Sequence, residues 1–409
     1  MNTPTLSNLS DLPELLIPLD AWEEQLDTHL HRLDPFFARS EAREQAKAYL
    51  KGLLSPVERK NGWQLAEHLG HRNPYRVQHV LDRAVWDADK VREDVSRFIV
   101  EHLGDPEGIG VLDESGFLKK GIHSVGVARQ YCGTAGRVEN CQVGVFLGYA
   151  SPKGHTLLDR ELYLPVEWVV EQARRDAAKV PPNVDFETKP ELAQQMLKRA
   201  WAAGVPLAFV TADTVYGQDK RLRACLEDHR QAYVLAVPCD HRVSLEHSRL
   251  RVDRRVQRLP ASAWQTLSCG AGSKGERLYD WACQPLDAPD VAGFGLWLLA
   301  RRSLSDPTEV AYYQVFAPSD TPLARMVQVA GTRWTVEVCF ESAKSEVGLD
   351  EYEVRSWHGW YRHITLALFA QALLTVVKKD HTEQTQKGGS LPPSRSLQTF
   401  KRSRGLFCP

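Results

Sequence analysis

Two aspartates end apolar, strand-like runs of the sequence. Asp113 ends the run "GIGVLD" and Asp213 ends "PLAFVTAD", about 100 residues later. An uncompensated carboxylate at the end of a buried strand is costly in free energy. A bound divalent cation offsets that cost, so two such acids brought to one place would form half of a metal site.

A third carboxylate stands in the helical stretch that begins at Gly331. One stripe of that helix carries acids and bases together: Arg333, Glu337, Glu341 and Lys344. Taken alone, this segment favours a salt-bridged surface helix. Two strand-end aspartates nevertheless need a third ligand, and a helix lying on the same sheet can supply it.

Two neighbouring acids are weaker candidates for the site. Glu114 follows Asp113, so the alternation of a strand points it to the opposite face and makes it a poor co-ligand. Glu341 lies one helical turn beyond Glu337 and is the main rival for the third position. The motif spacing described below favours Glu337.

The segments that would position the acids alternate between strands and helices from residue 106 onward. Strand-like runs occur at 109–115, 141–151, 156–165, 206–217 and 232–240, with helical segments at 190–203 and 219–230. This order describes a mixed sheet with helices packed on it. The two aspartates become neighbours if the first and fourth strands pair in the middle of that sheet.

Residues 20–104 show helical periodicity broken by turn signals. In "PYRVQHVLDRAVW", apolar residues form an inner stripe, which leaves Arg76, His79 and Arg83 together on the outer face. This is the layout of a helix-turn-helix with a basic recognition helix, which would bind DNA. A plain helical hairpin with a solvated charged face fits the spacing slightly better, so both interpretations stay open.

Residues 241–309 interrupt the alternation of strands and helices. The segment "HRVSLEHSRLRVDRRVQR" holds six arginines, among them Arg254 and Arg255, against two acids, and three tryptophans follow it. We interpret this region as an inserted β-rich subdomain whose arginines and aromatic rings suit nucleic acid. The alternative is that the tryptophans fill a small core and the arginines are merely solvated.

The composition sets wide bounds on the function. The 409 residues are too many for one compact core and predict two or three domains. A net charge of -1 means that any affinity for polyanions comes from local patches. The eight cysteines include no C-x-x-C pair, which argues against a zinc ribbon and fits reduced thiols in the cytoplasm. We expect neither a signal peptide nor a membrane span, because no apolar stretch approaches ~18 residues.

The three acids occur in contexts that match a known family. Asp113 in "VLDESGFLKKG", Asp213 in "FVTADTVYG" and Glu337 in "RWTVEVCFESAKSEVGL" together resemble the DDE triad of insertion-sequence transposases. The likeness is greatest to the insertion sequence 701 type, which is related to the group named after insertion sequence 4. The resemblance extends over most of the chain.

That group has a signature, Y-x2-R-x3-E-x6-K, around its catalytic glutamate. In this sequence Arg333, Glu337 and Lys344 fit the spacing, while Ala330 stands at the tyrosine position. The departure concerns whatever DNA contact the tyrosine ring would make, and it leaves the expected metal site intact.

The resemblance implies an α/β, RNase H-like fold, a mixed sheet flanked by helices with an N-terminal helical domain and an inserted β-rich subdomain. The expected divisions of the chain are a helical DNA-binding domain (1–105), the first part of the catalytic core (106–240), the insertion (241–309), the second part of the core (310–377) and a mobile basic tail (378–409).

The resemblance also implies a DNA transposase. Asp113, Asp213 and Glu337 would hold two Mg²⁺ ions, for which Mn²⁺ would substitute, and Arg333 and Lys344 would bind DNA phosphates. Water would release a 3′-OH at a transposon end, and that 3′-OH would attack target DNA. The implied partners are terminal inverted repeats, target DNA and a second copy of the chain, paired as a homodimer in a synaptic complex on the nucleoid.

Two other functions use the same features. A nuclease of the same fold would cut DNA without joining it, and the sequence does not separate the two because both use the same metal site. A regulator derived from a transposase would bind DNA without cutting it. The intact acids at all three positions, Asp113, Asp213 and Glu337, argue against such a silent protein.

Overall fold

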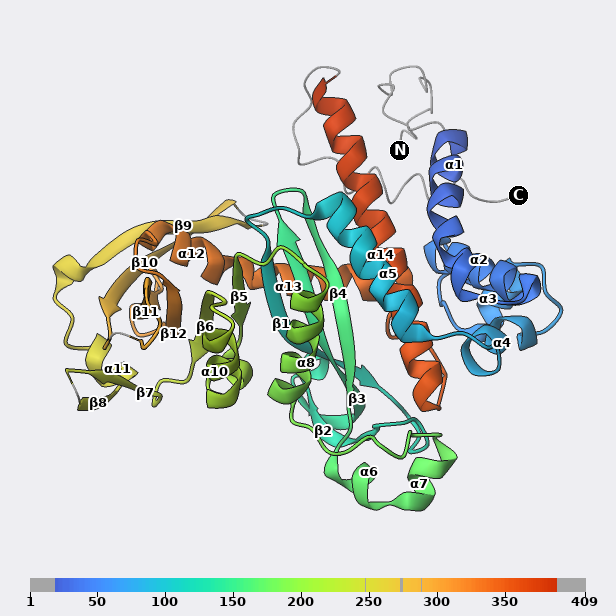
Figure 1. Ribbon diagram of the computed structural model, residues 1–409, viewed down its shortest axis with the longest axis horizontal. Coiled ribbons are helices and arrows are strands. Elements are labelled where there is room, and N and C mark those ends of the chain that lie inside the picture. Colours follow the sequence, from blue (N-terminus) through green and yellow to red (C-terminus); the bar gives the residue numbers. More distant parts are fainter. Residues whose placement is uncertain (1–18, 247, 273–274, 288, 388–409) are drawn as a thin grey trace, which may run out of the picture.

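The sheet that carries the two aspartates is mixed and has ten strands (Figure 1). The computed structural model describes residues 19–246, 248–272, 275–287 and 289–387. The strand order is β2-β3-β1-β5-β6-β12-β11-β10-β9, and β4 pairs with β3. The expected mixed sheet flanked by helices is therefore confirmed.

The strands of the main sheet follow the expected order along the chain. Their bounds are β1 Ile109–Leu118, β2 Ala128–Cys132, β3 Arg137–Ser151, β4 Gly154–Tyr163, β5 Phe209–Ala212, β6 Tyr233–Val237, β9 Trp264–Gly272, β10 Gly275–Pro285, β11 Phe294–Arg302 and β12 Val310–Pro318. The first and fourth expected strands, β1 and β5, pair in parallel, whereas β3 is antiparallel to both β1 and β4. The predicted pairing of the two aspartate-bearing strands is thus confirmed.

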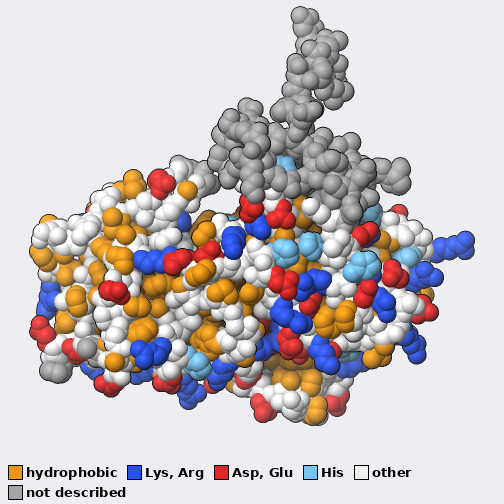
Figure 2. Space-filling view, turned by 45° about the horizontal axis from the view of Figure 1, so that its top comes forward, with side chains coloured by type: hydrophobic (Ala, Val, Ile, Leu, Met, Phe, Trp, Pro, Cys, Tyr) orange, Lys and Arg blue, Asp and Glu red, His pale blue; other side chains and the backbone are white. Residues whose placement is uncertain are grey.

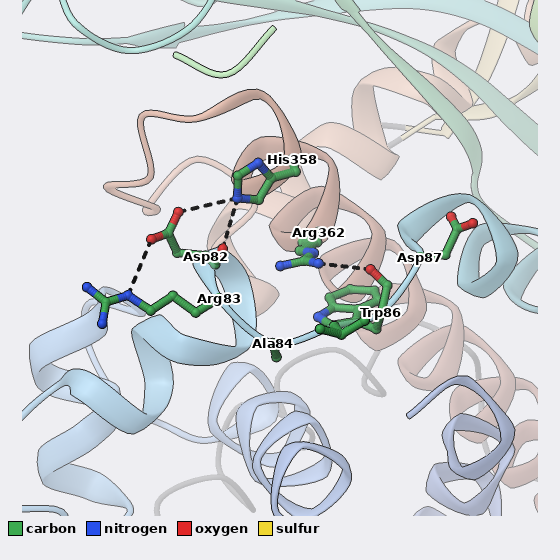
Figure 3. A pocket seen from close by; sticks show the side chains of 8 residues that line it. Asp82, Arg83, Ala84, Trp86, Asp87, His358 and Arg362 are labelled. Atoms are coloured by element: carbon green, nitrogen blue, oxygen red, sulfur yellow. Dashed lines mark hydrogen bonds and ion pairs between the residues drawn. The ribbon is translucent and has the colours of Figure 1, made fainter. Parts of the chain in front are cut away.

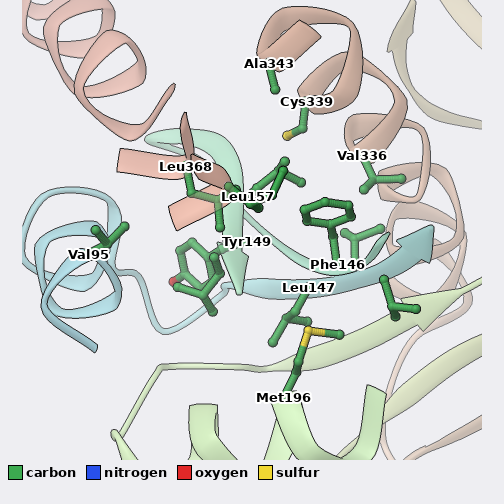
Figure 4. Packing of buried hydrophobic residues seen from close by; sticks show 14 of the residues in the cluster. Val95, Phe146, Leu147, Tyr149, Leu157, Met196, Val336, Cys339, Ala343 and Leu368 are labelled. Carbon is green, nitrogen blue, oxygen red and sulfur yellow. The ribbon is translucent and has the colours of Figure 1, made fainter. Parts of the chain in front are cut away.

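Helices cover both faces of this sheet. The larger ones are α2 Ser40–Leu54, α4 Tyr75–Asp82, α5 Ala88–Leu103, α8 Lys189–Ala202, α10 Lys220–Asp228, α12 Leu323–Thr332, α13 Trp334–Val347 and α14 Trp357–Lys387. In Figure 4, Phe146 of β3 points toward α13 while Leu147 points toward Met196 of α8, as the alternation of a strand requires. Helix α8 therefore covers one face, and α13 and α14 cover the other.

The helical front joins the rest of the molecule through α14. It contains α1 Leu19–Leu30, the 3₁₀ turn η2 His31–Phe36 and α3 Gly62–His68, together with α2, α4 and α5. The expected inner stripe of α4 is buried, and Asn73 accepts a hydrogen bond from the backbone N–H of Tyr75 at 3.2 Å. Helices α2, α4 and α5 pack on α14. The Tyr49 hydroxyl of α2 also lies 2.8 Å from Nδ1 of the buried His363.

Three strands of the insertion, β9, β10 and β11, continue the main sheet, and a hairpin forms a small second sheet. Strand β12 pairs with β6 on one side and with β11 on the other, and β10 and β9 follow outward. A small hairpin, β7 Arg242–Leu245 with β8 Ser248–Arg251, and the short helix α11 Val252–Val256 pack beside Leu298 of β11 in a separate apolar cluster. The expected β-rich character of this region is confirmed.

Three local expectations need correction. The strand expected at 206–217 stops at Ala212, because Asp213 caps the one-turn helix α9 Thr214–Gly217. The region expected as a tail from residue 378 begins as helix, since α14 continues to Lys387, and residues 388–409 lie outside the described part. The helical stretch after Gly331 is broken at Arg333, between α12 and α13. No helix of the described ranges is long and apolar enough to cross a membrane.

Candidate active site

Asp113 and Asp213 lie side by side, just beyond the last residues at which β1 and β5 pair. The parallel register ends at Leu112 and Ala212. Asp113 is the next residue of β1, and Asp213 is the first residue after β5. Parallel strands bring their carboxyl ends to the same edge of a sheet. Asp213 Oδ1 then accepts the backbone N–H of Val215 at 2.9 Å, which turns the chain into α9.

Ionising Asp113 and Asp213 together is costly in free energy. The Asp113 side chain is 12% exposed, and its burial, followed by the neighbouring Asp213 carboxylate, raises the pKa of Asp113 to about 7. Burial, followed by the charge of Glu114, also raises the pKa of Asp213. Both acids therefore hold protons more tightly than free aspartate does, and a nearby cation would favour their charged forms.

Glu337 approaches the pair from α13, on the face of β1 that Asp113 occupies. Arg333, at the break before this helix, places Nη1 3.4 Å from Asp113 Oδ2 and 3.8 Å from Glu337 Oε1. The guanidinium thus lies between the two carboxylates, and the Glu337 side chain is 47% exposed. Sequence spacing alone favours a surface salt bridge between Arg333 and Glu337. The structure shows this salt bridge, and Asp113 takes part in it as a second acid.

The rival acids lie elsewhere. Glu341 is exposed one turn beyond Glu337 on the same helix. Glu114 lies on the opposite face of β1, as its position predicts, and it contacts Lys189 and Tyr216. No local pattern of the sequence indicates these two partners of Glu114, because they lie 75 and 102 residues away along the chain.

Lys344 lies farther along β1 from the acids. Its Nζ donates to the carbonyl oxygen of Gly116 at 3.2 Å and to Oγ1 of Thr134 at 2.8 Å. Burial lowers the pKa of this amine.

Trp334, which helical periodicity places on the inward side, is instead 55% exposed, because Val336 and its neighbours at helical spacing form the buried stripe.

The residues present have the chemistry of a magnesium site. Carboxylate oxygens are the ligands that Mg²⁺ prefers. Asp113 is buried, Asp213 is partly buried, and both have raised pKa values. Within the described ranges, no three His, Cys, Asp or Glu side chains stand close enough together to hold a metal ion. The arrangement therefore brings two of the expected ligands together and leaves Glu337 on the far side of the Arg333 side chain.

The other residues expected to bind DNA, outside Arg333 and Lys344, lie apart from the acids. Arg76, His79 and Arg83 are exposed on and just after α4, within the helical front. Arg254 is exposed on α11, and Arg255 donates to Gln284 Oε1 at 2.5 Å. Figure 1 shows α4 and α11 at opposite ends of the molecule with β1 and β5 between them. Their roles in binding DNA stay predictions.

A pocket beside Arg83 shows how the helical front is held (Figure 3). Its lining includes Asp82, Trp86 and, from α14, His358 and Arg362. His358 Nε2 lies 2.9 Å from the carbonyl oxygen of Asp82, and Arg362 donates to the carbonyl oxygen of Trp86 at 2.9 Å. These bonds to backbone oxygens fix the loop after α4 on the last helix, so the orientation of the Arg83 backbone is set by α14.

The surface charge is mixed. On the face shown in Figure 2, lysine and arginine side chains alternate with aspartate and glutamate, and no continuous basic surface spans the face. This pattern agrees with the net charge of -1. Any phosphate-binding surface on this face would therefore be local.

The chain is similar to known proteins over part of its length. A family model described as DDE superfamily endonuclease matches residues 32–271, which include Asp113 and Asp213 and end before Glu337. A probable transposase for insertion sequence element IS701 from Microchaete diplosiphon is 29% identical over 200 residues. That match covers 47% of this chain and 48% of the relative, so the chain spans about half the length of the curated relative that it matches.

Proposed function

We propose that this chain, which belongs to the DDE superfamily of endonucleases, is a transposase that cuts DNA at the ends of an insertion sequence and joins the freed 3′-OH to target DNA. The observation that carries the proposal is the parallel pairing of β1 with β5, which places Asp113 beside Asp213, with Glu337 on a helix over the same face. The match to a probable IS701 transposase supports the same function.

Asp113, Asp213 and Glu337 would hold the divalent cations, Mg²⁺ or Mn²⁺ in its place, because all three offer hard oxygen ligands. When bound, these ions supply activation of the attacking oxygen and stabilisation of the leaving 3′ oxygen. The protein's own contribution is to keep two carboxylates close together at a site where their mutual repulsion favours a cation.

Arg333 and Lys344 would bind the DNA backbone near the acids. The Arg333 guanidinium already contacts two carboxylates, and a guanidinium binds phosphate in the same geometry as carboxylate. We therefore propose that it moves from these carboxylates to a DNA phosphate when the substrate arrives. Lys344 stands along β1 from Asp113, where its amine would meet a neighbouring phosphate.

The DNA would extend from the acids toward both ends of the molecule. The arginines of α4 and α11 flank the acids on either side, and phosphate contacts of this kind supply affinity without reading sequence. A homodimer would bring two transposon ends into one complex. Its site of action would be the nucleoid.

The test uses the full chain and a labelled duplex made from the DNA that borders its gene. With Mg²⁺ present, we expect a nick at the transposon end, and with a plasmid target we expect the labelled strand to become joined to it. Cleavage without joining would favour a nuclease of the same fold. DNA binding without cleavage under Mg²⁺ or Mn²⁺ would contradict both enzymes and favour a silent regulator.

A further inference from the structure

The backbone ladder between β1 and β5 ends just before the acids. The paired register stops at Leu112 and Ala212, after which β1 continues along β3 while Asp213 begins α9. Two neighbouring carboxylates repel one another when both are charged. Side chains must therefore hold Asp213 beside Asp113 beyond the end of the ladder.

Tyr216 makes that connection on the opposite face of the sheet. It lies in α9, the single turn that Asp213 caps, and its hydroxyl donates to Glu114 Oε2 at 2.7 Å. Its ring is fully buried. Since Glu114 is adjacent to Asp113 in β1, this hydrogen bond ties the turn that carries one aspartate to the strand that carries the other.

Lys189 holds the second oxygen of the same carboxylate. Its Nζ lies 2.6 Å from Glu114 Oε1, and both side chains are largely buried, at 21% and 18% exposed. Lys189 is the first residue of α8, and Thr188 and Glu191 form a capping box that fixes this helix start. The Glu114 carboxylate is thus held from two sides by groups on two different helices.

Glu114 is not itself placed to bind the cation. Because successive side chains of a strand point to opposite faces, it does not share the face of Asp113 where the cations would lie. Its contacts with Tyr216 and Lys189 therefore position the acids without making it a ligand.

We propose that Tyr216, Glu114 and Lys189 form a clamp of positioning residues that fixes Asp213 beside Asp113 and so sets the affinity of the site for divalent cations. The proposal rests on the proposed function, because it assumes that the two aspartates hold a cation. Groups that orient metal ligands typically change metal affinity by about 10- to 100-fold when they are removed.

The test measures Mn²⁺ binding to the full chain without DNA, by the loss of the electron paramagnetic resonance signal of free Mn²⁺. Tyr216→Phe removes one hydroxyl and keeps the buried ring, and we expect the dissociation constant for Mn²⁺ to rise roughly tenfold. Glu114→Gln, which keeps an acceptor oxygen but removes the charge, should also weaken binding.

Tyr233→Phe is the matched control. The Tyr233 hydroxyl of β6 donates to Glu227 Oε1 at 2.6 Å, and its ring is as deeply buried as that of Tyr216. Both variants lose a hydrogen bond between a buried tyrosine and a glutamate, and Tyr233→Phe also loses the bond that Gln314 Nε2 donates at 3.2 Å, so the control should lower the melting temperature at least as much. Only the variant in the clamp should change Mn²⁺ binding.

The outcomes separate the clamp from the function on which it rests. Wild-type binding in both Tyr216→Phe and Glu114→Gln would overturn the clamp, and so would an equal loss of binding in Tyr233→Phe. If the wild-type chain does not bind Mn²⁺, or if Asp213→Asn binds it equally well, the proposed metal site itself fails.

Discussion

Strands β1 and β4 carry acids in nearly the same local sequence, "VLDES" at 111–115 and "LLDRE" at 157–161. Both belong to the same sheet, and Asp113 and Asp159 are both buried, at 9% and 5% exposed. Their surroundings differ. Comparison of the two strands shows what distinguishes a buried acid that supports the fold from one that is available for binding.

In β4 the charges are matched by basic partners. Arg199 of α8 lies 2.9 Å from Asp159 Oδ2 and 2.6 Å from Glu161 Oε1. Arg160, which is fully buried, donates to Asp89 at 2.9 Å, and the Tyr361 hydroxyl donates to Glu161 Oε2 at 2.7 Å. A buried charge with this many partners is stable where it stands, and removing one partner is costly.

In β1 the buried carboxylate has fewer basic partners to balance its charge. Asp113 has Arg333 at 3.4 Å, but Asp213 lies beside it and raises its pKa together with burial. A buried carboxylate with a strongly raised pKa, next to a second acid, is a feature of binding and catalytic sites. The difference teaches that the partners brought by distant segments, more than the local sequence, decide the role of each acid.

The strongest test of this comparison replaces the acids of the candidate site by uncharged side chains. Asp113→Asn, Asp213→Asn and Glu337→Gln should each lower DNA cleavage by roughly 10³-fold or more, because each removes a cation ligand. Binding of the duplex, measured by fluorescence anisotropy, should stay close to wild type. Glu341→Gln is the control and should keep its activity. Loss in Glu341→Gln with activity in Glu337→Gln would mean that the third acid is misassigned.

The same kind of substitution in β4 should lower the stability of the fold and leave DNA cleavage intact. Asp159→Asn leaves Arg199 partly unpaired, so we expect the free energy of unfolding in urea to fall by about 3–5 kcal/mol. Cleavage per folded molecule should be preserved at a temperature where the variant remains folded. A variant of normal stability that no longer cleaves would show that β4 belongs to the active site and that the comparison is wrong.

The pH dependence of stability should distinguish the same two strands. The folded-state pKa of Asp113, about 7, is above its ordinary value, so the stability that its protonated form contributes is present at low pH and is lost as the pH rises through 7. Without metal, Asp113→Asn should therefore be more stable than wild type at pH 8, on the order of 2 kcal/mol. The two curves, measured by urea unfolding, should converge below about pH 4, where the carboxyl is protonated in the folded and the unfolded chain alike. A constant difference at all pH values would contradict the raised pKa.

Arg333 offers a smaller and subtler test. Because its guanidinium contacts Asp113 and Glu337, it competes with a cation for these oxygens. Arg333→Ala should therefore bind Mn²⁺ roughly fivefold more tightly in the absence of DNA, about 1 kcal/mol for an ion pair of this exposure, while its DNA cleavage falls. Calorimetric titration measures the affinity. Weaker Mn²⁺ binding in this variant would mean that Arg333 organises the acids for the cation.

The surface arginines should give the smallest effect. Replacing Arg254 and Arg255 by alanine should lower the salt dependence of DNA binding by about one unit of log–log slope for each phosphate that the protein no longer binds. Arg76→Ala with Arg83→Ala tests the helical front in the same way. Acid ligands do not bind phosphate, so Asp113→Asn should leave the slope unchanged. A double variant with the wild-type slope would show that its arginines are only a solvated face.

The features that could be predicted from the sequence are those with a local cause. Helical and strand periodicities predict the front and the alternating core, and the pairing of β1 with β5 follows from that order. The sequence places Asp113 and Asp213 at strand ends. The structure confirms that they are neighbours, but Asp113 lies within β1, which continues beside β3 to Leu118. The spacing of Arg333 and Glu337 predicts a shared helical stripe, and the two side chains do contact each other.

The features that could not be predicted depend on distant parts of the chain. The insertion extends the main sheet because β12 pairs with β6, some 80 residues away, and backbone pairing of this kind leaves no mark on local periodicity. The partners of Glu114 and of Asp159 come from α8 and α9. For this reason local periodicity does not separate "VLDES" from "LLDRE", and only the family resemblance marked Asp113 as a site residue.

The most direct test of the central claim locates the bound cation on the polypeptide. Fe²⁺ takes the same oxygen ligands as Mg²⁺, and with ascorbate and peroxide it produces radicals that cut the backbone beside it. We predict that mass spectrometry will find cuts near residues 113, 213 and 337, that excess Mg²⁺ will suppress them, and that Asp213→Asn will abolish them. Cuts near Asp159 on β4, or no cuts that depend on Asp213, would contradict the account.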